Sequence, residues 1–244
     1  MSEISITIPG GASKRLLTKG KLCDENIVVT AEGGGDSHYD AFWDAYQQNG
    51  NRADYDYAFA GNGWNDETFK PKYDIVITEG TTSMFHKCLI TDLVKILDDC
   101  GVTFDMSRSK ESTYFVNACS KLTTLPVLDC RGRANINYFI ISSGQLHTIE
   151  KVILKEDGSQ KFNNYSFLSL GGLKEIRFEG CIGYSLEIKA SSLLSAESVQ
   201  SIIDHLKDLT GQTAQTLTLH PTVGGNMTDT QKATITAKNW TLVY

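Results

Sequence analysis

Four short apolar runs recur at a spacing of 24 residues, and this period constrains the fold more than any other feature. The members of the series are Phe104 in VTFDMS, Leu128 in LPVLD, Val152 in KVILK and Ile176 in EIRFE. Each run is rich in leucine, β-branched or aromatic residues, which favour strands. A fixed period in the twenties is typical of a solenoid, whose repeats bury their apolar faces only by stacking on one another. We therefore expect an α/β solenoid.

The charge balance argues against two classes of partner. The 244 residues carry a net charge of -6, with no run of like charges and no lysine/arginine cluster, so we expect no nucleic-acid partner. No stretch approaches the ~18 apolar residues of a membrane helix, so we expect no membrane insertion. The N-terminus, MSEISITIPGG, has neither a basic start nor an apolar segment, and we expect no signal peptide.

The cysteines form no C-x-x-C pair and lie in apolar surroundings. In a reducing compartment such residues pack as small hydrophobic side chains, which is the interpretation we favour. A Cys119–Cys130 disulfide or a zinc site is the alternative. The six are Cys23, Cys88, Cys100, Cys119, Cys130 and Cys181.

The N-terminal part is expected to form an arm and a connecting region. The alternating run at 4–8 and the run at 26–30 predict a short β arm, which ends in Gly33-Gly34-Gly35, so the first segment is 1–35. Two short strands are marginal alone, so the arm should pair with another segment or another chain. In the connecting region, 36–72, we expect a helix over 39–48 and a loop over 61–72. The aromatics of that loop, Trp64 and Phe69, should pack onto a neighbouring element.

The array is expected to occupy 73–244. A first strand over 73–78 places Ile75 and Ile77 on one face, and helical spacing over 89–101 ends at Gly101. Each later connector carries one aromatic residue that should fill the core. These residues are Phe115, Phe139 and Phe167.

The period breaks before the C-terminal part of the chain. Ile188 follows Ile176 by only 12 residues, which we interpret as a half-length insertion or an irregular turn. Ser195 should begin a helix that Gly211 ends, and a strand should place Leu217 and Leu219 on one side. A capping box at 228–231 predicts a second helix before the aromatic end of the chain. Together these elements would form a helical cap over the last repeat.

No motif indicates catalysis. The sequence lacks a G-x-S-x-G nucleophile motif, an H-E-x-x-H pair, a complete phosphate loop and calcium-loop spacing. His86 and Cys88 are close in sequence, but one turn of a connector helix accounts for both without a metal. We therefore expect no catalytic residue, no cofactor and no metal, and a protein that is not an enzyme.

The candidate functional residues lie on surfaces. Alternate strand positions form a ladder of mixed charge, which is either a solvated outer face or a recognition face. The irregular places, namely the arm, the GNGWND loop and the segment near Gly180, are further candidates. The residues we select as an interaction surface are Trp64, Asn65, Asp66, Arg177, Glu179, Glu187 and Lys189.

Three segments carry a family resemblance. The block SLLSAESVQSIIDHLKDLTGQTAQTLTLHPTVGGNMTDTQKATITAKNWTLVY resembles the ending of BspA-type leucine-rich-repeat proteins of gut bacteria and their phages. LLTKGKLCDENIVVTAEG is similar to a segment that recurs in phage and prophage tail-associated proteins. FWDAYQQNGNRADYDYAFAGNGWND is similar to a segment that joins the two in such proteins.

The resemblance implies an irregular leucine-rich-repeat (BspA-like) array in a phage or prophage structural protein, of the tail-fibre or receptor-binding type. Its partners would be a protein or glycan on a cell surface and other virion proteins, with homo-oligomerisation through the arm. Its location would be the virion, or the bacterial cytoplasm before release. The alternative is a bacterial leucine-rich-repeat binding protein or adhesin that acts as a monomer.

Overall fold

The chain divides into two compact units, 1–50 and 51–244. The computed structural model describes residues 8–9, 31–32, 42–43, 55–110 and 113–244. In the first unit, β1 (Ile8–Pro9) pairs in parallel with β2 (Ala31–Glu32). The strand runs expected at 4–8 and 26–30 otherwise lie outside the described residues. So does the helix expected at 39–48, apart from its helical residues Phe42 and Trp43.

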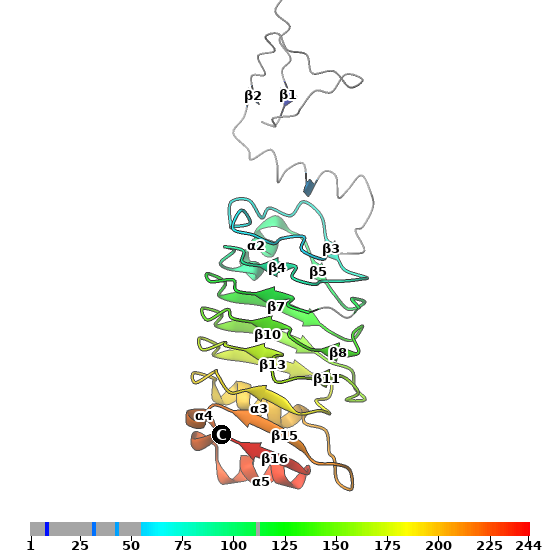
Figure 1. Cartoon of the computed structure of the whole chain (residues 1–244), viewed down its shortest axis with the longest axis vertical. Coiled ribbons are helices and arrows are strands. Elements are labelled where there is room, and N and C mark those ends of the chain that lie inside the picture. Colours follow the sequence, from blue (N-terminus) through cyan, green and yellow to red (C-terminus); the bar gives the residue numbers. More distant parts are fainter. Residues whose placement is uncertain (1–7, 10–30, 33–41, 44–54, 111–112) are drawn as a thin grey trace, which may run out of the picture. The chain divides into compact units, whose positions relative to one another are not determined.

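The second unit is a repeating array of short parallel strands, stacked in chain order (Figure 1). The strands are β3 (Ile75–Val76), β4 (Phe85–His86), β5 (Phe104–Asp105), β6 (Val116–Asn117), β7 (Thr124–Asp129), β8 (Asn135–Ile136), β9 (Ile140–Ile141), β10 (Thr148–Ile153), β11 (Lys161–Phe162), β12 (Phe167–Leu168), β13 (Glu175–Glu179), β14 (Leu186–Ile188), β15 (Gln215–Leu219) and β16 (Trp240–Val243). The helices are α2 (Leu93–Cys100), α3 (Ala196–His205), α4 (Pro221–Asn226) and α5 (Asp229–Ala237).

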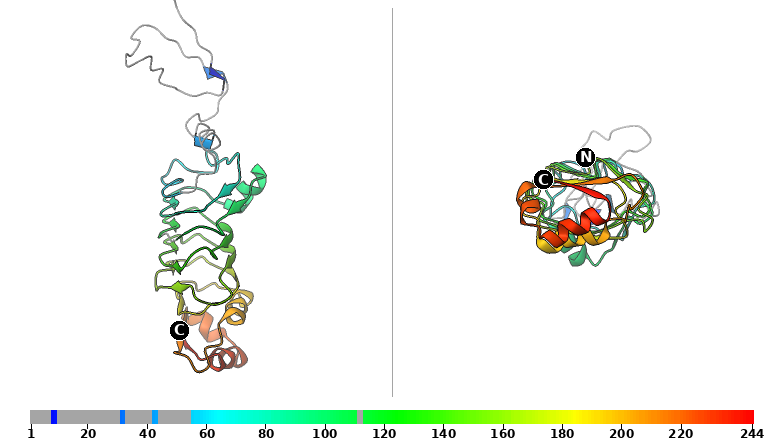
Figure 2. Two further views of the ribbon diagram at one scale, coloured as in Figure 1. Left: turned by 90° about the vertical axis from the view of Figure 1, so that its right-hand side faces the viewer. Right: turned by 90° about the horizontal axis from the view of Figure 1, so that it is seen from below.

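Two faces organise the array. The short-strand face has the order β12-β9-β6-β4, and the long-strand face has the order β13-β10-β7. From β6 to β13 each repeat contributes one short strand and then one long strand, and the two-stranded ladder β11-β8 lies between the long strand of one repeat and the short strand of the next. Successive turns of the chain overlie one another when viewed along the stack (Figure 2). This arrangement confirms an α/β array of parallel strands.

The register follows the 24-residue period at first and then departs from it. Leu128 lies opposite Val152, as predicted, but Val152 lies opposite Phe178. The prediction that Ile176 continues the series is wrong, because Ile176 lies opposite Ile149. Between these two pairs β10 has two residues and β13 has one, which is a β-bulge.

A column of phenylalanines fills the core behind the short-strand face, and the expected packing of the connector aromatics is confirmed. Ring centroids of neighbours in the column are 5.3, 5.7, 5.2 and 6.4 Å apart. The column consists of Phe59, Phe85, Phe115, Phe139 and Phe167, each at most 2% exposed. Each buried ring removes a large apolar area from water, and contacts between the rings join one repeat to the next.

The segment 55–61 forms a further turn of the array beside β4. Its alternate amides donate to carbonyls of the next turn, at 2.7–2.9 Å: Tyr55 to Gly80, Tyr57 to Thr82, Phe59 to Met84 and Gly61 to His86. Ile75 in β3 and Ile77 just after it are both buried, and α2 ends at Gly101 in a left-handed conformation (φ 65°), both as predicted. His86 lies in strand β4 and Cys88 follows the left-handed Lys87, so the helical turn expected there is wrong.

The break at Ile188 has a simple cause. Strand β14 continues from β12 of the short-strand face and pairs with β15, so the 12-residue step is the passage from one face to the other. The same step separates Leu128 in β7 from Ile140 in β9. The half-length insertion expected from the sequence is therefore wrong, because residues 176 and 188 belong to different faces of the array.

Helices cover the C-terminal end of the array. Ser195 caps α3 as predicted, but the helix ends at His205 rather than at Gly211, because Leu206 is extended and bridges to Ile182. The capping box at Thr228 begins α5, and Trp240 is buried in β16. No helix among the described residues combines the length and the apolarity that crossing a membrane needs.

Candidate interaction surface

The long-strand face presents an open, hydrogen-bonded surface of three strands. Alternate side chains of β7, β10 and β13 point outward, because successive side chains of a strand lie on opposite sides of the sheet. Inward residues such as Leu128 and Val152 are fully buried. The outward residues of the face are Val127, Asp129, Glu150, Lys151, Ile153, Glu175, Arg177 and Glu179, none of them buried.

A shallow hollow of about 390 Å³ lies on this face. It coincides with the bulge, where Glu150 and Lys151 oppose the single residue Arg177. Bulges bend the strand and redirect side chains, and here the bulge separates the side chains of three neighbouring strands. The hollow is lined by Val127, Thr148, Ile149, Glu150, Lys151, Glu175 and Arg177.

Two ion pairs flank the hollow. Lys151 Nζ lies 2.7 Å from Glu179 Oε2, and this contact lowers the pKa of Glu179. Arg131 binds both carboxylate oxygens of Asp129, with Nη2 at 2.6 Å from Oδ2, and the pKa of Arg131 is raised as a result. Exposed pairs of this kind add little stability, so their main effect is to fix where charge lies on the face.

The carboxylate of Glu175 is hydrogen-bonded to the start of the neighbouring helix, α3. Its Oε2 accepts hydrogen bonds from the hydroxyls of Ser195 at 2.9 Å and Ser198 at 3.3 Å. This carboxylate therefore joins β13 to the start of α3, and it is less available for a partner.

Arg177 is the unpaired cation of the face. Its side chain is exposed, and within the described part of the chain it makes no ion pair. It lines the hollow together with Val127, which is 37% exposed. An arginine and an aliphatic side chain beside one depression can bind a carboxylate and an apolar group of the same partner.

The selected residues of the GNGWND loop have internal partners. Trp64 is 7% exposed and packs edge-on against Phe59, as expected for the aromatics of this loop. The side-chain oxygen of Asn65 accepts the amides of residues 67 and 68. Asp66 accepts the amide of Thr91 at 2.7 Å and its hydroxyl at 2.5 Å.

The structure does not bring all of the selected residues together. The loop pairs with the segment after β4, through the bridge between Asn65 and Leu89. Arg177 and Glu179 lie in β13, which is a later repeat. Glu187 and Lys189, which form an ion pair of 2.7 Å, lie at β14 beyond it. Only Arg177 and Glu179 lie on the long-strand face.

A stack of three tyrosines on the surface was not predicted from the sequence. The rings of Tyr114 and Tyr138 are 5.3 Å apart, and those of Tyr138 and Tyr165 are 5.1 Å apart and nearly parallel. Tyr114 and Tyr138 have positive φ angles of 61° and 49°, which turn these side chains away from the phenylalanine column. A tyrosine one residue before Phe115 and Phe139, and two residues before Phe167, is the sequence signal that could have found the stack.

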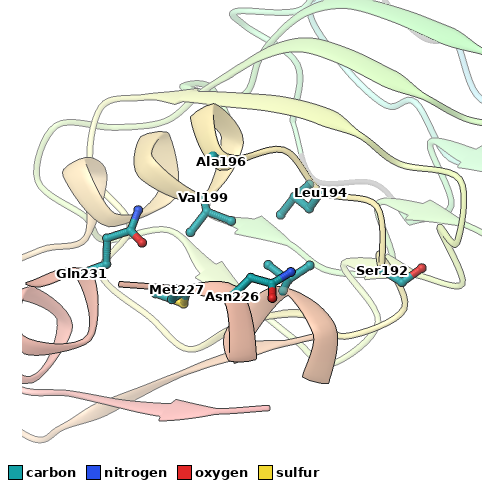
Figure 3. Close-up of a pocket in the computed structure, with 8 residues that line it drawn as sticks. Ser192, Leu194, Ala196, Val199, Asn226, Met227 and Gln231 are labelled. Atoms are coloured by element: carbon teal, nitrogen blue, oxygen red, sulfur yellow. The ribbon is translucent and has the colours of Figure 1, made fainter. Parts of the chain in front are cut away.

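A second depression lies in the C-terminal cap, between α3, α4 and the start of α5 (Figure 3). It has a volume of about 200 Å³. Its lining mixes apolar side chains with a serine and two amides: Ser192, Leu194, Ala196, Val199, Val223, Asn226, Met227 and Gln231. The sequence did not indicate this pocket, because α4 contains two glycines and carries no helical pattern.

The described residues contain no cluster of three or more histidine, cysteine, aspartate or glutamate side chains that could hold a metal ion. Comparison with known protein families, with characterised proteins and with solved structures finds no match.

Proposed function

We propose that this chain is a non-enzymatic structural or binding protein of a phage or prophage particle, of the tail-fibre or receptor-binding type. In this proposal the parallel-strand array is an irregular leucine-rich-repeat (BspA-like) solenoid that presents the long-strand face to its partner. The partner is a protein or glycan on a cell surface. Residues 1–35 would attach the chain to other virion proteins or to further copies of itself.

The observation that carries the proposal is the position of Arg177 on a rigid sheet. Interface hot spots are enriched in arginine, and a surface that needs no reordering on binding loses less entropy. Lys151 is neutralised by Glu179, whereas Arg177 remains available beside the exposed Val127. A partner that carries a carboxylate next to an apolar group fits this arrangement.

Binding of the fluorescently labelled full chain to intact bacterial cells tests the surface. Arg177→Glu should weaken binding by about tenfold or more, because it replaces the anchoring cation with a like charge to the carboxylate. Lys121→Glu makes the same change of charge at an exposed turn outside the face and should leave binding unchanged. Equal binding by both variants and the original chain would contradict the assigned surface.

Two further measurements test the particle context. A chain without residues 1–35 should remain folded and lose association with the particle; retention would count against the role of the arm. Size-exclusion chromatography with light scattering should give a trimer or larger assembly. A clean monomer would favour the alternative, a bacterial leucine-rich-repeat binding protein or adhesin.

A further inference from the structure

Two cysteines occupy the same place in consecutive repeats. Cys88 lies two residues after His86 in β4, and Cys119 lies two residues after Asn117 in β6; His86 and Asn117 are direct partners in the parallel ladder. The two sulfur atoms are 3.2 Å apart, and the Cys88 thiol donates to the sulfur of Cys119. Both side chains are fully buried.

The backbone holds the two side chains in this arrangement. Each cysteine follows a residue in the left-handed conformation, Lys87 (φ 56°) and Ala118 (φ 55°), so both chains turn the same corner. The amide of Lys87 donates to the carbonyl of Asn117 at 2.8 Å, and the amide of Cys119 donates to the hydroxyl of Ser143 at 3.3 Å. The corners of consecutive repeats are thereby fixed one strand spacing apart.

This spacing suits a disulfide. Neighbouring strands lie about 4.8 Å apart, and disulfides join Cα atoms that are about 4.4–6.8 Å apart. A bond between the two sulfurs therefore requires rotation of the side chains, without displacement of either strand. Within the described residues, no other pair of cysteines has its sulfurs in contact.

We propose that Cys88 and Cys119 are a modification site, at which a low-molecular-weight disulfide such as oxidised glutathione converts the two thiols into a disulfide between repeats. In the first step one thiolate attacks a sulfur of the reagent, which forms a mixed disulfide and releases one reduced glutathione. In the second step the other thiolate attacks the protein sulfur of the mixed disulfide, closes the bond and releases the second glutathione. Two protons and two electrons pass from the protein to the reagent.

The exchange depends on opening of the array. The hydrogen bond to Cys119, together with burial, raises the pKa of the Cys88 thiol, and the thiolate is the reacting species. The pair therefore reacts when the repeats around β4 open transiently or before they close during folding. Once formed, the bond spans 31 residues and joins two repeats near the beginning of the array. Because each repeat of such an array is supported only by its neighbours, this bond opposes local opening there.

The test uses the full chain, treated with oxidised or reduced glutathione, alkylated after unfolding, and mapped by mass spectrometry. The oxidised sample should contain a Cys88–Cys119 linked peptide, lighter by two hydrogens than the separate peptides. Its unfolding temperature should exceed that of the reduced sample by about 5–10 °C. The peptide map is made on the chain without any substitution, so its result does not depend on whether a variant folds.

Variants provide the matched controls. Cys130→Ser, which removes a buried thiol elsewhere in the array, should leave the linked peptide and the temperature difference intact. Cys88→Ser should abolish both. The proposal is overturned if the oxidised chain leaves both thiols open to alkylation after unfolding, or if either cysteine is joined to a different one, such as Cys130 or Cys23.

Discussion

The hydroxyl of Ser198, in helix α3, accepts the backbone N–H of Ile176, in strand β13, at 2.9 Å. One turn further, the hydroxyl of Ser201 accepts the N–H of Phe178 at 2.9 Å. Strand β13 is the last strand of the long-strand face, and its outer edge would otherwise expose these amides. Two serines on one side of a helix thus take the place of the next strand, and they end the sheet without leaving an open edge.

Replacement of Ser198 by alanine tests whether its hydroxyl is needed to end the sheet. Ser198 is fully buried, so the N–H of Ile176 would lose its acceptor away from water. We expect a loss of about 1–3 kcal/mol in the free energy of unfolding, measured by urea denaturation. Ser120→Ala, at an exposed turn, should change it by less than about 0.5 kcal/mol. Equal stability of the two variants would show that the hydroxyl of Ser198 is not needed to end the sheet.

The inner and outer aromatic columns should differ in their contribution to stability. Phe139 is fully buried, stacks on Phe115 at 5.2 Å and lies beside the guanidinium of Arg133. Phe139→Ala should reduce the free energy of unfolding by about 3–5 kcal/mol, because it removes apolar contacts and leaves a cavity. Tyr165, which is 45% exposed, stacks on Tyr138 at the surface. Tyr165→Ala should cost only about 0.5–1.5 kcal/mol. Similar losses would mean that the outer stack also holds the array together.

The ion pair of Lys151 and Glu179 makes the stability of the folded chain depend on pH, and the direction follows from the pKa of Glu179. Lys151 lowers the pKa of Glu179 below its usual value of 4.5. A carboxyl whose pKa is lowered on folding contributes stability above the unfolded value, and this contribution is lost as the pH falls below 4.5 through the folded value. Lys151→Met should return the pKa of Glu179 towards 4.5, measured by carboxyl NMR titration. The shift in the original chain should also shrink as salt is added, because the pair is exposed.

Lys189→Met is the matched control, since it removes a lysine from a separate ion pair with Glu187. The pKa of Glu179 should not respond to it. A lowered pKa that persists in Lys151→Met would assign the effect to other charges of the face.

Patterns within each repeat predicted the array. The features that these patterns missed depend on contacts between one repeat and the next. The 24-residue period predicted the pairing of Leu128 with Val152, because each residue of a stacked strand meets its counterpart one repeat away. The bulge at Glu150 and Lys151 was missed, since an extra residue in one strand becomes visible only beside its neighbour. The period also followed one side of the array only, from β5 through β7 and β10 to β13, so Ile188 on the other face was interpreted as an irregularity of the repeat.

The candidate surface was predicted only in part, for a related reason. Alternation along β13 places Arg177 and Glu179 outward, and this much follows from the sequence. That Lys151 reaches Glu179 depends on the bulge, which places Glu150 and Lys151 opposite the single residue Arg177. Asp66 was selected as part of an interaction surface, yet it binds Thr91, which is 25 residues away in the chain. Such partners depend on which turn of the chain lies over which other turn. The type of a residue does not show this.

Gly224 provides a test of how the ring of Tyr244 packs against helix α4. It lies in α4, and a Cβ placed there would be 2.2 Å from Cγ of the Tyr244 ring. Tyr244 also lies against Lys232, whose Nζ is 5.3 Å from the ring centroid. Gly224→Ala in the full chain should therefore displace the ring and lower the free energy of unfolding by about 1 kcal/mol.

The same substitution should have the opposite sign in a chain that ends at Val243. Without the ring there is no clash, and alanine favours a helix over glycine by up to about 1 kcal/mol. Urea denaturation of the four chains, with and without each change, separates the two effects in one cycle. If Gly224→Ala destabilises both chains equally, the glycine is required by α4 itself. A change of sign would mean that Gly224 leaves room for the ring of Tyr244, and that this ring is packed as part of the cap.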